Sequence, residues 1–214
     1  MKTLATFLLV LVFQPGFTII NNPYDDAMKG ALEELNQAGS LEDFQSAANH
    51  FDRIANVEKD KWLPSYYAAY AKVMLAAMQQ DLEQKDPYLD AAQENLDAVA
   101  VIEHDESERL ALQGFLTMIR MSVDPARGME LGMNCGMTVE QAYALNNENP
   151  RALLMLAQFK HGSAQYMGQD TSEYCAMFEE VLEMLDQPAQ EGSDPFSPRW
   201  GKNMTTMLLQ QCQK

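Results

Sequence analysis

The chain has 214 residues and a formal net charge of −16 at pH 7, which is enough length for one sizeable domain with its own core. The acidity argues against a nucleic-acid-binding protein, because phosphate backbones are bound through Lys and Arg. It also argues against docking on anionic lipid. A solvated acidic surface is the ordinary interpretation of this charge.

The first residues have the features of a secretory signal peptide. Lys2 supplies a positive charge, an apolar stretch runs from Leu4 to Phe13, and Gln14-Pro15-Gly16 ends it. This stretch is too short to span a bilayer. We place the signal peptide at residues 1–21 and expect an exported protein, periplasmic or secreted, with no membrane span in the mature chain.

The rest of the chain, taken as one domain over residues 22–214, has a helical pattern. Apolar residues such as Phe44, Ala47 and Phe51 recur at intervals of three and four, which is typical of helices buried on one side. No comparable stretch alternates apolar and polar residues, so we predict no sheet. The predicted helices cover residues 24–38, 41–56, 64–80, 87–103, 106–122, 125–146, 150–166, 171–186 and 199–212.

Capping residues mark the predicted helix starts. An Asn or Asp oxygen accepts a hydrogen bond from a free N–H group of the first turn, and Pro at the first helical position loses no helix bond. Ser40–Asp43 and Asp170–Glu173 have the pattern of capping segments without Pro. The pairs with Pro are Asn22-Pro23, Asp86-Pro87, Asp124-Pro125 and Asn149-Pro150.

Short turns between these helices predict an all-α fold of about nine helices. We expect a right-handed α-solenoid of stacked antiparallel helix pairs, closed by a capping helix near residues 199–212.

Three segments carry a resemblance to a known family. They are FDRIANVEKDKWLPSYYAAYAKV (residues 51–73), NENPRALLMLAQ (147–158) and SPRWGKNMTTMLLQQC (197–212). Together they resemble a family of small exported bacterial proteins that are similar to tetratricopeptide-repeat (TPR) proteins. The resemblance covers essentially the whole mature chain and implies a TPR-like solenoid, but it brings no established activity or ligand.

Motifs for catalysis are absent from the sequence. It has no Gly-rich phosphate loop, no His-Glu-x-x-His and no nucleophile elbow. We therefore expect no enzymatic activity and no cofactor. The predicted function is a non-catalytic scaffold that binds an unidentified protein or peptide in a concave groove.

The candidate partner-binding residues are Trp62, Tyr66, Tyr67, Tyr70 and Arg151. Aromatic side chains with a polar tip are favoured at binding surfaces, and a guanidinium suits a carboxylate such as a peptide C-terminus. The structural alternative is the commoner role of such residues. In that case the aromatic side chains pack between helix pairs, and Arg151 forms an ion pair across an inter-helix turn.

The segment 127–138 combines regularly spaced glycines and methionines with one cysteine. The ordinary interpretation is a neighbouring helix that passes close to the glycines, with flexible Met side chains filling gaps. The alternative function is a soft-metal (copper) site, since thioethers and thiolates suit Cu(I). The glycines are Gly128, Gly132 and Gly136, and the metal candidates are Met129, Met133, Met137 and Cys135.

The three cysteines are Cys135, Cys175 and Cys212, and their spacing matches no zinc motif. Burial as small apolar side chains is the favoured interpretation. In an oxidising compartment the alternative is one disulfide in any of the three pairings.

Overall fold

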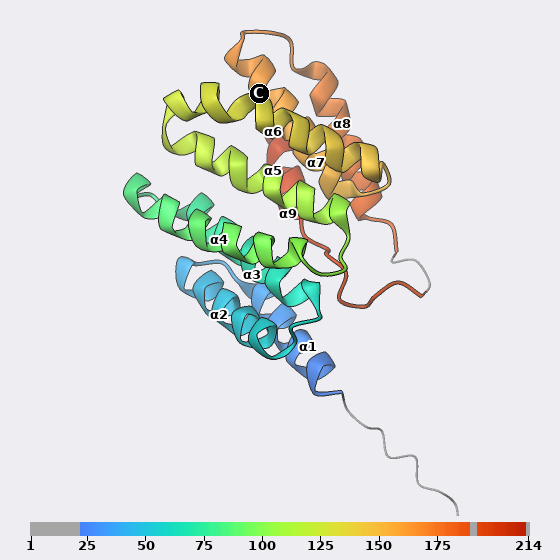
Figure 1. The fold of residues 1–214 in the computed structure, drawn as a ribbon. Helices are drawn as coiled ribbons and strands as arrows, with labels where there is room; N and C mark the ends of the chain where they lie inside the picture. The colour runs from blue at the N-terminus through green and yellow to red at the C-terminus, as the bar shows by residue number, and fades with distance from the viewer. Residues whose placement is uncertain (1–21, 189–191, 213–214) are drawn as a thin grey trace, which may run out of the picture.

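The computed structural model describes residues 22–188 and 192–212, so the predicted signal peptide lies outside the described residues. Within the described part, the chain forms nine α-helices, one short 3₁₀ helix and no strand (Figure 1). This confirms the all-α prediction. The elements are α1 (Pro23–Gln37), α2 (Leu41–Val57), α3 (Trp62–Met78), η1 (Leu82–Gln84), α4 (Lys85–Ala100), α5 (Glu106–Val123), α6 (Pro125–Leu145), α7 (Pro150–Tyr166), α8 (Ser172–Leu185) and α9 (Lys202–Cys212).

Local capping explains where several helices begin. Asn22, Asp124 and Asn149 are the N-caps of α1, α6 and α7, and each side chain accepts a hydrogen bond from the first turn. Ser40 forms a reciprocal capping box with Asp43 at the start of α2. These four helix starts confirm the predictions made from the sequence.

Two other predicted starts need correction. η1 leads directly into α4, so α4 begins at Lys85, before the Asp86-Pro87 pair, and its N-cap Gln84 makes no side-chain hydrogen bond. At α8 the N-cap is Thr171, which also makes no side-chain cap. The carboxylate of Asp170 accepts a hydrogen bond from the backbone N–H of Ser172 instead, at 3.0 Å.

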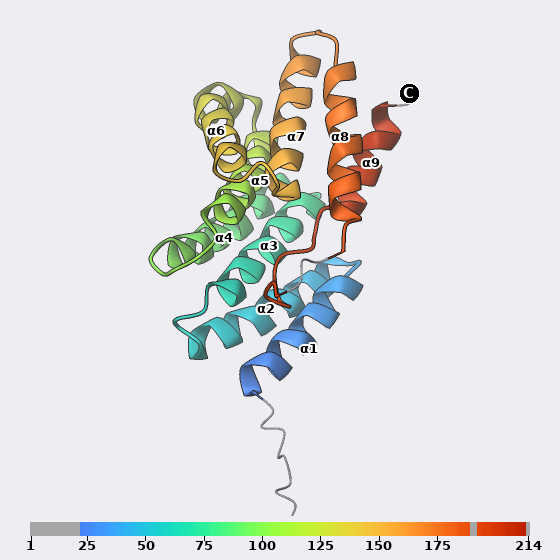
Figure 2. The ribbon, with the colours of Figure 1, turned by 90° about the vertical axis from the view of Figure 1, so that its right-hand side faces the viewer.

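The helices pack as neighbours along the chain. Each helix packs against the next, and α5 also contacts α3 and α7. In Figure 2, α4 and α6 lie on one side of α3, α5 and α7, and α8 and α9 lie on the other side. None of the described helices is both long and apolar enough to cross a lipid bilayer. The regular right-handed solenoid stays a prediction.

A continuous cluster of buried apolar side chains extends from Met28 in α1 to Trp200, just before α9. One disulfide reinforces its C-terminal end, because Cys175 in α8 is bonded to Cys212 in α9. Cys135 is free and buried. The favoured prediction, burial as a small apolar side chain, is therefore right for Cys135 alone. For Cys175 and Cys212 the alternative, a disulfide, is right.

The segment that precedes α9 folds back onto the core. The hydroxyl of Tyr67 donates a hydrogen bond to the backbone oxygen of Phe196 at 2.8 Å, and Nε1 of Trp200 donates to the hydroxyl of Tyr66 at 2.9 Å. The indole of Trp200 also stacks on Tyr70, with ring centroids 4.9 Å apart. These contacts hold residues 194–200, which we call the C-terminal strap, against α3.

Candidate ligand cleft

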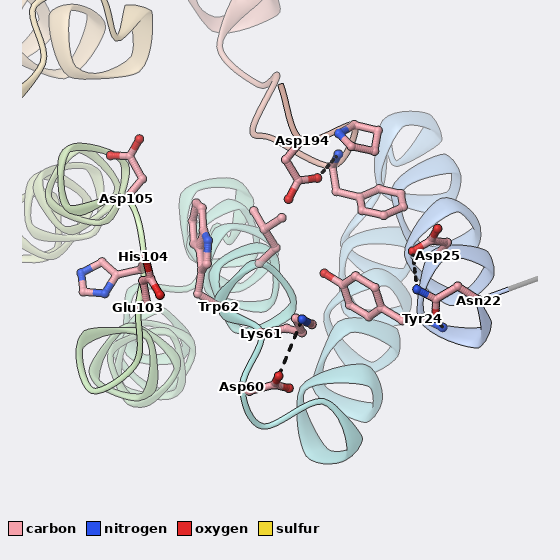
Figure 3. Close-up of a pocket in the computed structure, with 13 residues that line it drawn as sticks. Asn22, Tyr24, Asp25, Asp60, Lys61, Trp62, Glu103, His104, Asp105 and Asp194 are labelled. Atoms are coloured by element: carbon pink, nitrogen blue, oxygen red, sulfur yellow. Dashed lines mark hydrogen bonds and ion pairs between the residues drawn. The ribbon is translucent and has the colours of Figure 1, made fainter. Parts of the chain in front are cut away.

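A cleft of about 850 Å³ lies where the N-terminal ends of α1, α3 and α5 meet the C-terminal strap (Figure 3). Local structure positions its walls, because Asn22, Lys61 and Asp105 are the N-caps of these three helices. The lining residues are Asn22, Tyr24, Asp25, Asp60, Lys61, Trp62, Leu63, Glu103, His104, Asp105, Asp194, Pro195 and Phe196. We refer to this site as the cleft.

Aromatic side chains form the apolar part of the cleft. Figure 3 shows the phenol of Tyr24 and the indole of Trp62 on opposite sides of the cleft. Phe196 of the strap meets Tyr24 edge-to-face, with ring centroids 5.8 Å apart. Trp62 is the first residue of α3 and packs edge-to-face on Tyr66, with ring centroids 5.3 Å apart. These contacts fix wall residues from three separate parts of the chain, which are α1, α3 and the strap.

Carboxylates dominate the charge of the cleft. Five acidic residues line it, against one lysine. That lysine, Lys61, has its Nζ 3.6 Å from the carboxylate of Asp60. Burial raises the pKa of the Tyr24 hydroxyl, and the surrounding carboxylates, Asp194 foremost, raise it further. Burial is the larger cause, and the part due to the carboxylates reflects negative charge around the Tyr24 hydroxyl, which opposes formation of a phenolate.

The histidine of the cleft is occupied by other partners. Nδ1 of His104 lies 2.6 Å from the backbone oxygen of Ile102, and Nε2 is hydrogen-bonded to the carboxylate of Glu106. Figure 3 shows the imidazole turned away from Tyr24 and Trp62. Both ring nitrogens are thus engaged, which leaves His104 unsuited to act as a base or metal ligand in the cleft.

A smaller pocket of about 280 Å³ adjoins the cleft, and the two share Trp62 and Asp105. It reaches a buried ion pair in which Nε and Nη2 of Arg151 donate to both carboxylate oxygens of Glu108 at 2.6–2.8 Å. The hydroxyl of Tyr66 donates to the same carboxylate at 2.9 Å. The polar groups at the base of this pocket therefore already have hydrogen-bond partners within the protein.

The structure separates the predicted partner-binding residues. Trp62 lines the cleft, as a binding residue must. Tyr66 and Tyr67 have only 0% and 3% of their surface exposed, and Tyr70 is covered by the indole of Trp200. These three tyrosines therefore do not line an open concave groove, because the C-terminal strap covers the surface on which we expected the partner.

Arg151 also differs from its proposed role as a carboxylate receptor. Its side chain is buried, and Glu108 already accepts hydrogen bonds from two of its nitrogens. Arg151 instead forms an ion pair, as the structural alternative predicted. Glu108 lies on α5, 43 residues away, so the pair joins two helices instead of the two sides of one turn.

The structure does not bring the predicted copper ligands together. Met129 and Met133 are 89% and 74% exposed on α6, Met137 is also exposed, and Cys135 is buried with its thiol directed to the backbone oxygen of Gly114. The thioethers and the thiol therefore lie on different faces of one helix. Burial also raises the pKa of the Cys135 thiol to about 12, which disfavours the thiolate that a metal needs.

The methionines also correct the ordinary interpretation of this segment, since exposed side chains fill no core gap. Only part of the glycine prediction holds. A Cβ added at Gly136 would meet the ring of Phe159 at 2.9 Å, whereas one at Gly128 would meet nothing within 4 Å. A close helix approach thus explains Gly136 but not Gly128.

Sequence reasoning missed Tyr24, Phe196 and most of the acidic lining. One available signal was the DPFSP segment (residues 194–198), in which each proline restricts the residue before it, Asp194 or Ser197, to extended backbone and disfavours a helix. No local pattern connects this segment to Tyr24 at the start of α1. Only packing brings the two rings together.

Comparison with known proteins gives a fold and no family. No protein-family model matches the chain, and no curated protein matches it. Among solved structures, the chain is similar to the HusA haemophore from Porphyromonas gingivalis, with a TM-score of 0.77 and 24% sequence identity. The match covers 88% of this chain and 92% of that chain. At this identity the likeness shows the fold alone, and membership of a TPR-like family stays a prediction.

Proposed function

We propose that this chain is an exported, non-catalytic binding protein whose cleft takes a cationic segment of a protein or peptide. The observation that carries the proposal is the combination of aromatic walls with five carboxylates around one space. Export rests on the signal-peptide pattern of residues 1–21. The partner would thus bind at the cleft that Trp62 lines and not at the buried tyrosines.

The charges support a cationic ligand. One pair of unit charges at 4 Å is worth about 1 kcal/mol in bulk water and about 4 kcal/mol near a protein surface. Several carboxylates act on the same ligand charge here, so a cation gains attraction from each, and an anion is repelled by each. The raised pKa of Tyr24 has the same origin in part, because its phenolate is an anion placed in this field.

The aromatic walls support an Arg or Lys side chain in particular. A guanidinium over an aromatic face gains roughly 0.5–2 kcal/mol, depending on how much water is excluded. Trp62 and Tyr24 are half-buried in the cleft wall, and the aliphatic stem of Arg or Lys suits the apolar surface of Tyr24, which the buried ring of Phe196 supports from behind. A basic peptide segment thus matches both the charge and the walls.

A binding role is also supported over catalysis. The imidazole of His104 has both nitrogens engaged, and the cleft carboxylates Asp60 and Asp194 are exposed at its rim. The fold is that of a haemophore, whose name denotes a binding protein. These points favour a site that holds a ligand without transforming it.

A second candidate ligand is a tetrapyrrole, and the likeness to the HusA haemophore favours it. The cleft volume of about 850 Å³ lies in the usual range for ligand pockets. Aromatic walls suit a planar ring. Lys61, beside an α3 N-terminus that has no side-chain cap, is the part of the cleft that suits a carboxylate such as a propionate. The surrounding acidic residues oppose the same group.

The test compares two peptides and haem on the full mature chain. A fluorescein-labelled Arg-rich peptide and its counterpart with Glu in place of Arg are titrated by anisotropy, and haem is titrated by its Soret absorbance. Trp62→Ala is matched with Tyr166→Ala, which removes an aromatic ring that is 90% exposed and outside the cleft. Asp60→Asn is matched with Glu130→Gln, an exposed acid on α6.

We expect binding of the Arg-rich peptide alone, weakened about five- to thirtyfold by Trp62→Ala, which corresponds to roughly 1–2 kcal/mol. Asp60→Asn should weaken it more than Glu130→Gln does. Equal effects of the cleft and control variants would show that the acidic surface as a whole binds the peptide and would overturn the proposal. Haem binding that is lost on Trp62→Ala and Lys61→Ala, without peptide binding, would replace it with the second candidate.

A further inference from the structure

Three metal-ligating side chains meet outside the cleft, on the helices at the C-terminal end of the fold. His161 belongs to α7, Cys175 to α8 and Cys212 to α9. One ring nitrogen of His161 and the two Sγ atoms all lie within 4.8 Å of one another. Figure 2 shows the three helices side by side, in agreement with the packing of α7 on α8 and α8 on α9.

His161 differs from the other two histidines in its hydrogen bonds. His50 is bound to Glu34 and His104 to Glu106. His161 has no hydrogen-bond partner within the described residues, and its ring packs against that of Phe178, with centroids 5.7 Å apart. A ring nitrogen of His161 is therefore free to coordinate a metal ion that also binds the two sulfur atoms.

Two thiolates and one imidazole are a ligand set for zinc. Zn²⁺ takes sulfur at about 2.3 Å and nitrogen at about 2.0–2.1 Å in tetrahedral geometry, so its ligand atoms stand roughly 3.5–4 Å apart. One nitrogen of His161 lies within 4.8 Å of both sulfur atoms, so the three side chains reach one position once the two sulfur atoms move apart to that spacing. In the disulfide form the sulfur atoms are bonded to each other and offer no thiolate, so only reduction makes the set complete.

We propose that His161, Cys175 and Cys212 form a redox-gated site for a thiophilic divalent cation of the zinc class. A dithiol reductant gives two electrons and two protons to the disulfide, which becomes two thiols as the reductant becomes a disulfide. The cation then displaces the two thiol protons, and His161 adds a neutral nitrogen, with water in the fourth position.

The site provides a second cross-link between the helices at the C-terminal end of the fold. When the disulfide opens, the cation links α8 to α9 in its place and adds α7 to the link. Because the C-terminal strap leads into α9, the same link keeps the strap anchored at its C-terminal end. The site is independent of the ligand proposed for the cleft.

The test uses the full mature chain, reduced with a phosphine, which is not a thiol ligand. Co²⁺ serves as the spectroscopic probe, since thiolate coordination gives near-ultraviolet charge-transfer bands, and Zn²⁺ affinity follows from competition. His161→Ala keeps the disulfide and is matched with His50→Ala, a part-buried histidine on α2. The Cys175→Ser/Cys212→Ser double variant provides the background, and circular dichroism reports the helical content.

We expect the reduced chain to bind one Co²⁺ with thiolate bands, and the oxidised chain to show none. His161→Ala should weaken binding at least about tenfold, a loss typical of a metal ligand and its support, whereas His50→Ala should not. Equal affinity of His161→Ala and the wild type would overturn the site, as would equal affinity of the reduced chain and the double Ser variant. Loss of helicity on reduction that zinc does not restore would also overturn it.

Discussion

Arg151 and Glu108 form a buried, bidentate ion pair although they stand 43 residues apart in the chain. The pair joins α7 to α5, and Tyr66 of α3 donates to the same carboxylate. Trp200 donates in turn to Tyr66, so the network ends in the C-terminal strap. One polar network thus connects three helices with the strap that forms part of the cleft wall.

Breaking this buried ion pair should lower the free energy of unfolding much more than breaking a surface ion pair. Arg151→Ala leaves the Glu108 carboxylate buried without its counter-charge, and we expect the free energy of unfolding to fall by about 3–5 kcal/mol. Lys202→Ala breaks the exposed pair with Asp186 and should cost less than about 1 kcal/mol. Urea denaturation followed by circular dichroism measures both. Similar losses in the two variants would contradict the buried role of Arg151.

Gly114 should be intolerant of a methyl group. A Cβ at this position would overlap the side chain of Val139, where α5 and α6 pack closely. We expect Gly114→Ala to destabilise the fold by about 1–3 kcal/mol, because a packed core resists added volume. Gly132→Ala, where the nearest atom is 3.9 Å away, should stabilise it by roughly 0.5–1 kcal/mol. Thermal unfolding separates these opposite signs, and two shifts in the same direction would refute the prediction.

Stability should decrease in acid partly through Glu106. The hydrogen bond from Arg109 lowers the pKa of Glu106 to about 2, from an ordinary value of 4.5. The unfolded chain therefore takes up this proton at a higher pH than the folded chain. The contribution of Glu106 to stability is complete above about pH 4.5 and is lost as the pH falls through about 2.

Glu106→Gln should flatten the dependence of unfolding free energy on pH within that window. Arg109→Met should do the same, because it removes the main cause of the lowered pKa. Urea denaturation at a series of pH values is the measurement. An unchanged slope in both variants would show that this pair does not control acid stability.

The disulfide should stabilise the C-terminal end of the fold. It closes a loop of 37 residues, and the chain-entropy model assigns such a loop about 3–4 kcal/mol. We expect Cys175→Ser to lower the free energy of unfolding by that amount and to fray α9 first. Cys135→Ala removes the free thiol and serves as the control, with a loss of roughly 1 kcal/mol expected from its size. Equal losses would contradict a specific role of the disulfide.

The sequence by itself determined the helices and most of their starts. The hydrogen bond from Arg151 N–H to the Asn149 side chain spans two residues, so the motif that contains it reveals the start of α7. The apolar period of Phe44, Ala47 and Phe51 likewise reveals the buried face of α2, because that face depends only on helix geometry. Such signals are local, so they can be recognised in the sequence without knowing how the helices pack.

Only the tertiary structure decided which side chains are accessible and which meet. Tyr66 and Trp62 stand four residues apart on one helix, yet Tyr66 is buried under Trp200 while Trp62 lines the cleft. The pairing of Cys175 with Cys212 and the approach of Phe196 to Tyr24 also depend on how distant segments pack. The physical reason is that burial and proximity result from the packing of the whole chain, whereas capping and periodicity act within a few residues.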